Sequence, residues 1–241
     1  MQVSHIVPTD LLYLIENRDF YMCLANIANI NSEYLEFYKR KSQEGKFILL
    51  DNGEAEGNQM DLDNMLDIIK EINPSEIILN DELNNREKTI EKSFIALDFY
   101  KSKGYDKQLM FVAQGIDFID WCENFQEKEL LKNIHTIGIP KVISKKWTTY
   151  DRYDCCKQLS ILNFDIHLLG CNEPLNYLKY FNKLKNIRSI DTALSYLKAK
   201  ANEKIDIGIR PNTTMDFINH QLLDINLLKY NIETFDKTIM D

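Results

Sequence analysis

The stretch FILLDNGEAEGNQMDLDNMLDIIKEINPSEIILND (residues 47–81) holds one complete strand–helix–strand unit, and this unit indicates the fold class. Its first apolar run (47–53) ends in a carboxylate and an Asn-Gly turn sequence, as a buried strand often does. Asp61 then precedes LDNMLDIIKEI, where apolar residues recur at helical spacing, and Pro74 ends that helix before a second apolar run (76–81). A strand, a helix and a second strand in this order indicate a parallel sheet.

The same alternation extends along the whole chain, which contains eight short apolar segments. They read HIVPT (5–9), FYMCLA (20–25), FILLDNG (47–53), EIILND (76–81), QLMFVAQG (108–115), TIGIP (136–140), DIHLLG (165–170) and IRSID (187–191). Most of the intervening stretches are long enough for a helix. Eight strands separated by helical connections is the count of a closed parallel barrel, so the sequence predicts an α/β fold of the (β/α)8 TIM-like barrel type.

The stretches after these strands carry helical patterns. Helices are expected at 89–103, 150–162, 174–184 and 215–230. The segment ALSYLKAKAN, which follows Asp191 closely, is expected to form the last helix of the barrel. We therefore expect one catalytic barrel domain (1–205) and a C-terminal helical extension packed on it (206–241).

Composition narrows the class of protein. The 241 residues carry a formal net charge of −8, which argues against non-specific nucleic-acid binding by the whole surface. No stretch approaches the ~20 continuous apolar residues of a membrane span, and the N-terminus lacks the basic and long apolar regions of a secretory signal. Five cysteines without disulfide-framework spacing favour reduced thiols in a cytoplasmic protein.

Polar side chains stand at the C-terminal ends of four of the expected strands: Asp51, Asp81, Gln114 and Asp191. In a parallel barrel the active site lies at those ends. Taken singly, Asp51 could close an Asx-turn and Asp191 could be a helix N-cap. Together they lie five strands apart, across the barrel mouth, and paired carboxylates suit cleavage at an anomeric carbon. The two are therefore the candidate catalytic residues.

The remaining strand-end residues suit recognition of a planar heterocycle. Gln114 offers both a donor and an acceptor, and Asp81 could accept from a donor edge such as that of guanine. A glycine inside or at the end of a barrel strand, as at Gly115, Gly138 and Gly170, marks close approach of a ligand or of another backbone, although a bulge would also explain it.

The order of LLDNG, LND, FVAQG, TIGIP, HLLG and RSID resembles that of the tRNA-guanine transglycosylases, most closely their shorter phage-type relatives that act on DNA. The resemblance implies that Asp191 is the nucleophile and that Asp51 handles a proton and contacts the base. It also implies that Asp81 and Gln114 grip the heterocycle and that Gly138 presents its backbone beside it.

The chain departs from that family in several places. Asn52-Gly53-Glu54-Ala55-Glu56 stands where most of the tRNA enzymes have Ser-Gly-Gly-Phe-Gln, and Thr192 and the residues after it replace a proline and arginine. No cysteine follows Cys171, so the Cys-x-Cys-x2-Cys zinc cluster of the family is missing and we expect no metal and no cofactor. Because the zinc subdomain helps those enzymes hold tRNA, DNA is the favoured polymer, with tRNA as the other option.

Two basic stretches, 141–157 and 179–204, could form a rim that holds phosphates around the barrel mouth. The candidate contacts to the nucleic-acid backbone are Lys145, Lys146, Arg152, Arg188 and Lys198. The other interpretation is that these side chains form ordinary solvated helix faces.

These features predict a base-exchange enzyme. Asp191 would attack C1′ of a guanine nucleotide, and a free 7-deazaguanine of the preQ0 or preQ1 type would replace the expelled guanine. One alternative is a glycosidase-like or pyrophosphorylase-like barrel enzyme that acts in hypermodification of phage DNA bases. Another is a non-catalytic module that binds a nucleobase or a nucleic acid. Fold alone does not separate the three.

Overall fold

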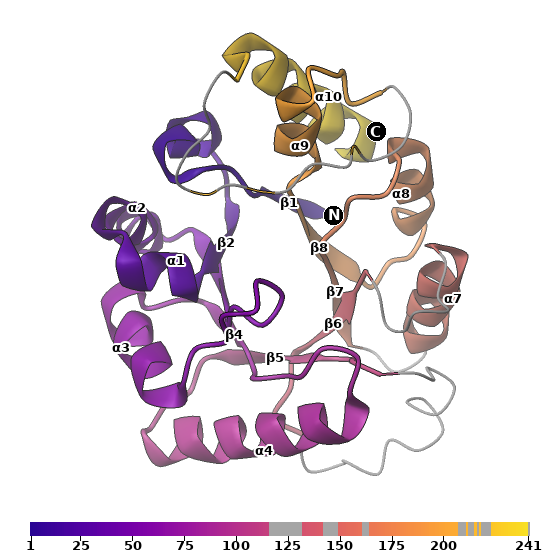
Figure 1. The fold of residues 1–241 in the computed structure, drawn as a ribbon. Helices are drawn as coiled ribbons and strands as arrows, with labels where there is room; N and C mark the ends of the chain where they lie inside the picture. The colour runs from indigo at the N-terminus through magenta and orange to yellow at the C-terminus, as the bar shows by residue number, and fades with distance from the viewer. Residues whose placement is uncertain are drawn as a thin grey trace.

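Eight parallel strands of the computed structural model form one nearly closed barrel with helices around its outside (Figure 1). The strands are β1 (Gln2–His5), β2 (Phe20–Leu24), β3 (Phe47–Asp51), β4 (Glu76–Ile78), β5 (Gln108–Val112), β6 (Thr136–Pro140), β7 (Asp165–Leu169) and β8 (Ile187–Thr192). Their order in the sheet is β1-β8-β7-β6-β5-β4-β3-β2. The (β/α)8 barrel predicted from the sequence is therefore confirmed.

Helices follow the strands. They are a 3-10 helix η1 (Thr9–Ile15), then α1 (Ala25–Ile30), α2 (Ser32–Gln43), α3 (Leu62–Ile72), α4 (Arg86–Ser102), α7 (Thr149–Leu159), α8 (Leu175–Phe181), α9 (Leu194–Lys200) and α10 (Ile225–Met240). The structure describes residues 1–115, 132–141, 149–160, 164–206, 211, 215, 217 and 223–240. None of the helices in these ranges has the length and apolar content needed to cross a membrane.

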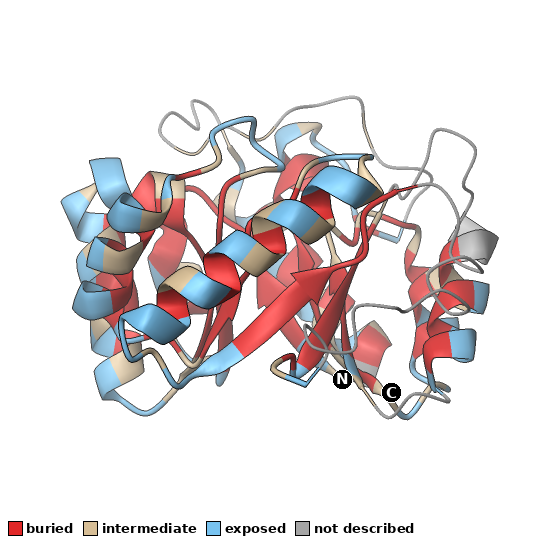
Figure 2. Cartoon of the chain, turned by 90° about the horizontal axis from the view of Figure 1, so that it is seen from below, coloured by how far each residue is buried: buried red, intermediate tan, exposed pale blue. Residues whose placement is uncertain are grey.

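The core occupies the barrel interior and the layer between strands and helices. Figure 2 shows the strands almost wholly buried, while the helices turn exposed faces outward. Strands buried on both faces read as continuous apolar runs, which is why the sequence located them so readily. Of the five cysteines, the four within the described ranges are buried free thiols, and Cys122 lies outside those ranges.

Local signals fix the ends of α3 as the sequence predicted. The Asp61 side chain accepts from the Asn64 backbone N–H at 2.9 Å and caps the first turn. Asn73 adopts a left-handed conformation (φ 52°) directly after the last turn, and Pro74 follows it. The chain therefore leaves α3 sharply and enters β4.

Two predicted elements differ most from the observed ones, while others differ by up to three residues at an end. The first strand spans 2–5 rather than 5–9, because Pro8 cannot donate a ladder hydrogen bond and precedes η1. The C-terminal helix spans 225–240 rather than 215–230, although it does pack on the barrel: Asp236 Oδ1 lies 2.9 Å from His5 Nε2.

β1 and β2 are the two ends of the ladder order, so the barrel has a seam between them. A hydrogen bond crosses this seam: the Met22 backbone N–H donates to Ser4 Oγ at 2.8 Å. On its other side, β1 pairs with β8 in parallel register, Gln2 opposite Ser189.

Candidate active site

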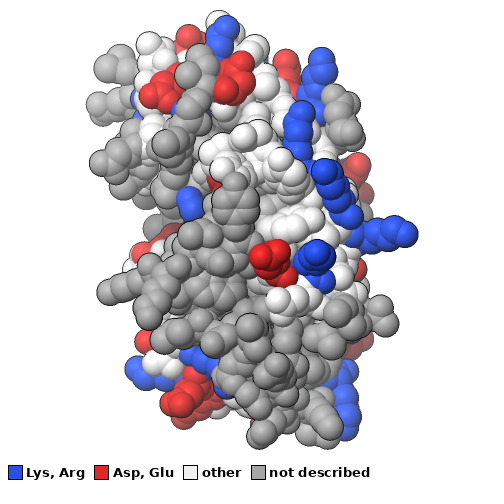
Figure 3. Space-filling model, turned by 90° about the vertical axis from the view of Figure 1, so that its right-hand side faces the viewer, with Lys and Arg blue, Asp and Glu red and all other residues white. Residues whose placement is uncertain are grey.

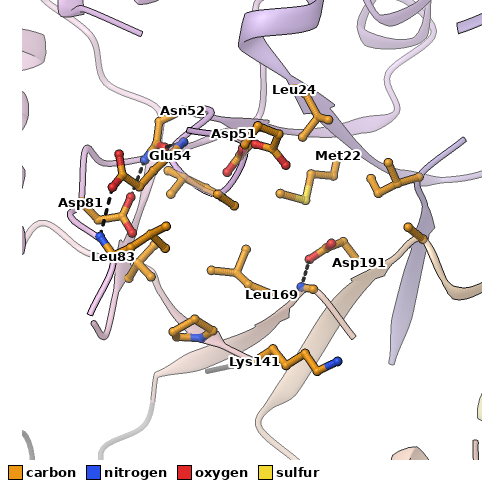
Figure 4. A pocket seen from close by; sticks show the side chains of 18 of the residues that line it. Met22, Leu24, Asp51, Asn52, Glu54, Asp81, Leu83, Lys141, Leu169 and Asp191 are labelled. Carbon is orange, nitrogen blue, oxygen red and sulfur yellow. Dashed lines mark hydrogen bonds between the residues drawn. The ribbon is translucent and has the colours of Figure 1, made fainter. Parts of the chain in front are cut away.

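A cavity of about 430 Å³ opens at the C-terminal ends of the strands. The polar residues predicted to form the site all line it: Asp51, Asp81, Gln114 and Asp191. Figure 4 shows Asp51, Asp81 and Asp191 around the cavity. Its apolar walls come from strand side chains, among them Met22, Leu24, Ile78, Val112 and Leu169. The four polar side chains that the sequence places at strand ends therefore meet in one cavity.

Asp191 is fixed from one side. The Gly170 backbone N–H donates to Asp191 Oδ1 at 2.8 Å, and His167 Nε2 lies 3.2 Å from the same oxygen. The Cys171 N–H donates to the Asp191 backbone oxygen at 2.8 Å, and Thr192 Oγ1 donates to the Cys171 oxygen. The segment that follows β7 is thus tied to the end of β8, and the carboxylate has little freedom to rotate.

Asp51 ends β3 on another wall of the cavity, apart from Asp191 (Figure 4). The Gly53 backbone N–H donates to its Oδ2 at 3.1 Å. Burial raises the pKa of the Asp51 carboxyl well above its usual range, and the charges of Glu56, Asp81 and Asp191 raise it further. Asp51 therefore holds a proton more readily than an exposed aspartate does.

Asp81 stands in a network of amide side chains. Asn52 Nδ2 donates to Asp81 Oδ1 at 2.9 Å, and Gln114 Nε2 donates to Asp81 Oδ2 at 2.7 Å. Gln114 Oε1 in turn accepts from the Asn84 N–H at 3.2 Å. Burial raises the pKa of the Asp81 carboxyl, and the two amide donors oppose that rise. The network presents a fixed row of polar atoms at one wall of the cavity.

The three glycines predicted to contact the base have different surroundings. Gly170 lines the cavity and adopts a left-handed conformation (φ +65°). A Cβ at Gly115 would lie 2.7 Å from the Arg86 Cβ, and one at Gly138 would lie 3.0 Å from the nearest atoms of Met110 and Leu169. Protein packing thus accounts for Gly115 and Gly138, and neither is among the residues that line the cavity.

Three of the predicted contacts to a nucleic-acid backbone are wrong, because their side chains are engaged inside the protein. Arg152 is 1% exposed and pairs with Glu173, and Lys198 is equally buried. Arg188 pairs with Glu76 at the start of β4, at the end of the barrel away from the cavity. Lys145 and Lys146 lie outside the described residues.

The basic stretch 179–204 also lies away from the cavity. Lys183 and Lys185 are exposed in the connection that enters β8, and Lys204 follows α9. In a parallel barrel, connections that enter strands lie at the opposite end from the active site. Figure 3 shows Lys and Arg side chains in a row along one edge of the face on the α7 and α8 side. The predicted basic rim around the mouth is thus wrong for this stretch.

Sequence reasoning missed two residues of the site. His167 is fully buried in β7 beside Asp191, and Lys141 lines the cavity directly after β6. A single histidine inside the apolar run DIHLLG was the available signal for the first. In the described ranges, no cluster of three or more His, Cys, Asp or Glu side chains could hold a metal ion.

No protein-family model matches the chain, and no curated protein matches it. Similar solved structures share the barrel. D-psicose 3-epimerase from Clostridium cellulolyticum H10 is 9% identical with a TM-score of 0.55, covering all of this chain and 98% of its own. Phosphoribosyl anthranilate isomerase from Thermococcus kodakaraensis is 14% identical with a TM-score of 0.50, covering 96% of this chain and 97% of its own.

A third similar structure is the HpcH/HpaI aldolase from Desulfitobacterium hafniense DCB-2, which is 9% identical with a TM-score of 0.52. It covers 83% of this chain and 90% of its own. At these identities the likeness establishes the fold alone, a TIM barrel of the kind that these three enzymes have.

Proposed function

We propose that the chain is a base-exchange glycosyltransferase that replaces guanine in nucleic acid, DNA by preference, with a 7-deazaguanine. The observation that carries the proposal is the pair Asp51 and Asp191, which line one cavity from β3 and β8. An enzymatic role fits the barrel, because the cavity lies at the end where such barrels hold their active sites. The resemblance of the strand-end motifs to the transglycosylases supplies the reaction.

The nucleophile is Asp191. Among the described residues, the donors to its carboxylate, Gly170 and His167, both reach Oδ1. Oδ2 is therefore the oxygen that attacks C1′ of the nucleotide. The bond from C1′ to N9 of guanine breaks, its electron pair leaves with the base, and a glycosyl ester of Asp191 forms.

Asp51 acts as the general acid and then as the general base. With its pKa raised by burial, the carboxyl can protonate the departing guanine and then, as the carboxylate, accept the N9 proton of the incoming base. That base attacks C1′ and expels Asp191 Oδ2, so one glycosidic bond replaces another without an external energy source. The 7-deazaguanine keeps N9 and differs from guanine only on the five-membered ring.

Recognition of the base falls to the network of Asp81, Asn52 and Gln114. Its carboxylate and amide atoms supply acceptors and donors in a fixed arrangement, which matches the N1-H, amino and carbonyl edge of a guanine-like ring. Apolar side chains on the other walls, such as Met22 and Leu169, suit the faces of a flat heterocycle.

The polymer stays at the rim while the target base enters the cavity. Glu54, Glu56, Asp81 and Asp191 all line it, so a phosphate group inside would be repelled. A base inside a duplex cannot reach the cavity unless it is flipped out, which favours single-stranded or locally opened DNA.

An exchange assay tests the proposal. Radiolabelled guanine or preQ0 is incubated with the protein and with single-stranded DNA, duplex DNA or tRNA. We expect label in DNA with the wild type and none with Asp191→Ala, and the intact glycosyl-enzyme should be trapped by acid quench and mass spectrometry. Asp67→Ala, which changes an exposed carboxylate on α3 far from the cavity, is the matched control and should exchange normally.

Other outcomes would contradict the proposal in distinct ways. Release of a base without incorporation of label would indicate a glycosidase. Binding of a base or of DNA that persists unchanged in Asp191→Ala, without any release, would indicate a binding module.

A further inference from the structure

A buried ion pair lies behind the Asp191 carboxylate and outside the cavity lining. Arg152, in the first turn of α7, donates from Nη1 to Glu173 Oε1 at 2.7 Å. The two side chains are 1% and 3% exposed. Neither is among the residues that line the cavity, so neither touches a ligand there.

The other arm of the guanidinium holds the ends of two strands. Arg152 Nη2 donates to the Ile139 oxygen at 2.6 Å and to the Leu169 oxygen at 2.7 Å. The Leu169 carbonyl and the Gly170 N–H belong to one peptide unit. That N–H donates to Asp191 Oδ1 at 2.8 Å, so a continuous series of contacts leads from Glu173 to Asp191.

Two physical effects act along this series. A cationic donor on a carbonyl oxygen pulls electron density from the peptide, which makes the N–H of the same unit a stronger donor. The planar guanidinium also fixes the plane of the peptide, and with it the direction of the N–H. Gly170 can present its N–H in this way because its φ of +65° is open to glycine.

Stability alone is a weak reason for such a pair. Burying two charges costs desolvation free energy, and apolar residues of similar volume often replace a buried pair with no loss of stability. The contact that an apolar residue could not reproduce is the one to the Leu169 carbonyl. That contact lies one peptide from the proposed nucleophile.

We propose that Arg152, held by Glu173, is a positioning residue for Asp191 and acts through the Leu169–Gly170 peptide. The catalytic consequence rests on the proposed function. The contact series itself does not, and it can be measured without turnover.

The first measurement is NMR of protein labelled with [15N]glycine. The chain has 8 glycines, so the spectrum holds at most that number of amide signals, and Gly170→Ala identifies the Gly170 signal by its loss. In Glu173→Gln and Arg152→Lys the Gly170 amide proton should move upfield, because its peptide is less polarised. The signal of Gly45, far along the chain on the α2 side, should stay in place.

The second measurement is steady-state exchange with the same variants. We expect kcat to fall by about 100-fold in Arg152→Met, since a small misplacement of a reacting group has that effect, while KM for the free base changes little. Arg152→Lys should recover part of the rate because it restores a cation. If Arg152→Met does not fold, Glu173→Gln, which keeps the shape of the side chain, takes its place.

Lys41→Gln is the matched control. Lys41 is a buried cation, 3% exposed, that pairs with Glu16 and Glu44 on the outer side of the barrel. Its loss removes a buried cation whose two carboxylate partners, Glu16 and Glu44, are 36% and 38% exposed, and it should leave both the Gly170 signal and kcat unchanged.

The outcomes separate the two proposals. An unmoved Gly170 signal in folded Glu173→Gln and Arg152→Lys, or a wild-type kcat in both, overturns the positioning role. A wild type that exchanges no base, together with a Gly170 signal that still follows Arg152, overturns the proposed function and supports the positioning of Asp191.

Discussion

His167 and Asp191 face each other from neighbouring strands, with His167 Nε2 3.2 Å from Asp191 Oδ1. Ser189 Oγ lies 2.8 Å from His167 Nδ1 and accepts from Arg188 Nε at 3.3 Å, which leaves the Ser189 hydroxyl proton for Nδ1. Burial lowers the pKa of His167 below its usual value, so the ring is neutral at neutral pH. We infer that its one N–H is on Nε2 and points at Asp191.

Replacing His167 should therefore slow exchange. His167→Phe removes one of the two donors to Asp191 Oδ1 and keeps an aromatic ring beside Phe20. A hydrogen bond to a charged group contributes about 1.5–3 kcal/mol, which corresponds to a fall in kcat of about 10-fold to 100-fold. His135→Phe changes an exposed ring and is the control in the same assay. A wild-type rate in His167→Phe would refute the role of this hydrogen bond.

The raised pKa of Asp51 makes the stability of the protein depend on pH. The folded state holds the Asp51 proton more tightly than the unfolded state, so the group's contribution to stability is greatest below the unfolded pKa and is lost as pH rises through the folded pKa. Asp51→Asn cannot ionise and should escape this loss. Urea denaturation from pH 4 to 9 should show the variant gaining stability over the wild type as pH rises, while exchange activity is abolished. A difference that is constant across that range would contradict the assigned shift.

Two of the glycines with positive φ near the cavity, Gly170 and Gly115, should differ in their tolerance of alanine. At Gly170 (φ +65°) an added Cβ meets nothing within 4 Å, so Gly170→Ala should cost only the conformational strain of about 1 kcal/mol. At Gly115 (φ +103°) the Cβ would also meet the Arg86 backbone N at 2.9 Å. Overpacking adds to strain there, and Gly115→Ala should cost about 3 kcal/mol. Urea midpoints of the two variants check this order.

Among the described residues, Lys141 is the basic one that lines the cavity, and its substitution tests the choice of polymer. If DNA crosses the mouth, Lys141→Ala should weaken binding of single-stranded DNA to a similar extent for all sequences. The slope of log affinity against log salt should fall by about 1, as for the loss of one phosphate contact. Lys183→Ala, at the opposite end of the barrel, should bind as the wild type does. Equal effects of the two substitutions would argue against passage of DNA across the cavity.

The sequence predicted the architecture well because parallel strands buried on both faces leave an unmistakable apolar run. Seven of the eight runs coincide with strands, and the first, HIVPT (5–9), shares only His5 with β1. A predicted strand was misplaced where an apolar segment contains a residue whose backbone cannot donate a hydrogen bond. HIVPT is apolar, but Pro8 has no N–H to donate to a strand ladder, so β1 lies before Pro8. The terminal helix is ten residues later at its start than its apolar pattern indicated, and Met215 and Phe217 line the cavity instead.

The sequence predicted those residues of the candidate site that lie at the C-terminal ends of strands. Asp51, Asp81, Gln114 and Asp191 meet in one cavity because parallel strands finish at one edge. The sequence did not show which basic side chains are buried or toward which part of the protein they point. Arg152 reads as a surface charge in sequence, and its partner Glu173 is 21 residues away, so only the folded chain shows that the two neutralise each other in the interior.

The seam between β1 and β2 affects the order in which the barrel can fold during synthesis. Gln2 has its ladder neighbour at Ser189, so the strand of the barrel that is made first is the last to find its ladder partner. Seven strands can assemble in order of synthesis from β2 to β8, while β1 has no ladder partner until β8 has been made. Until residue 192 has emerged, the hydrophobic interior stays open on one side to chaperones, proteases and other nascent chains.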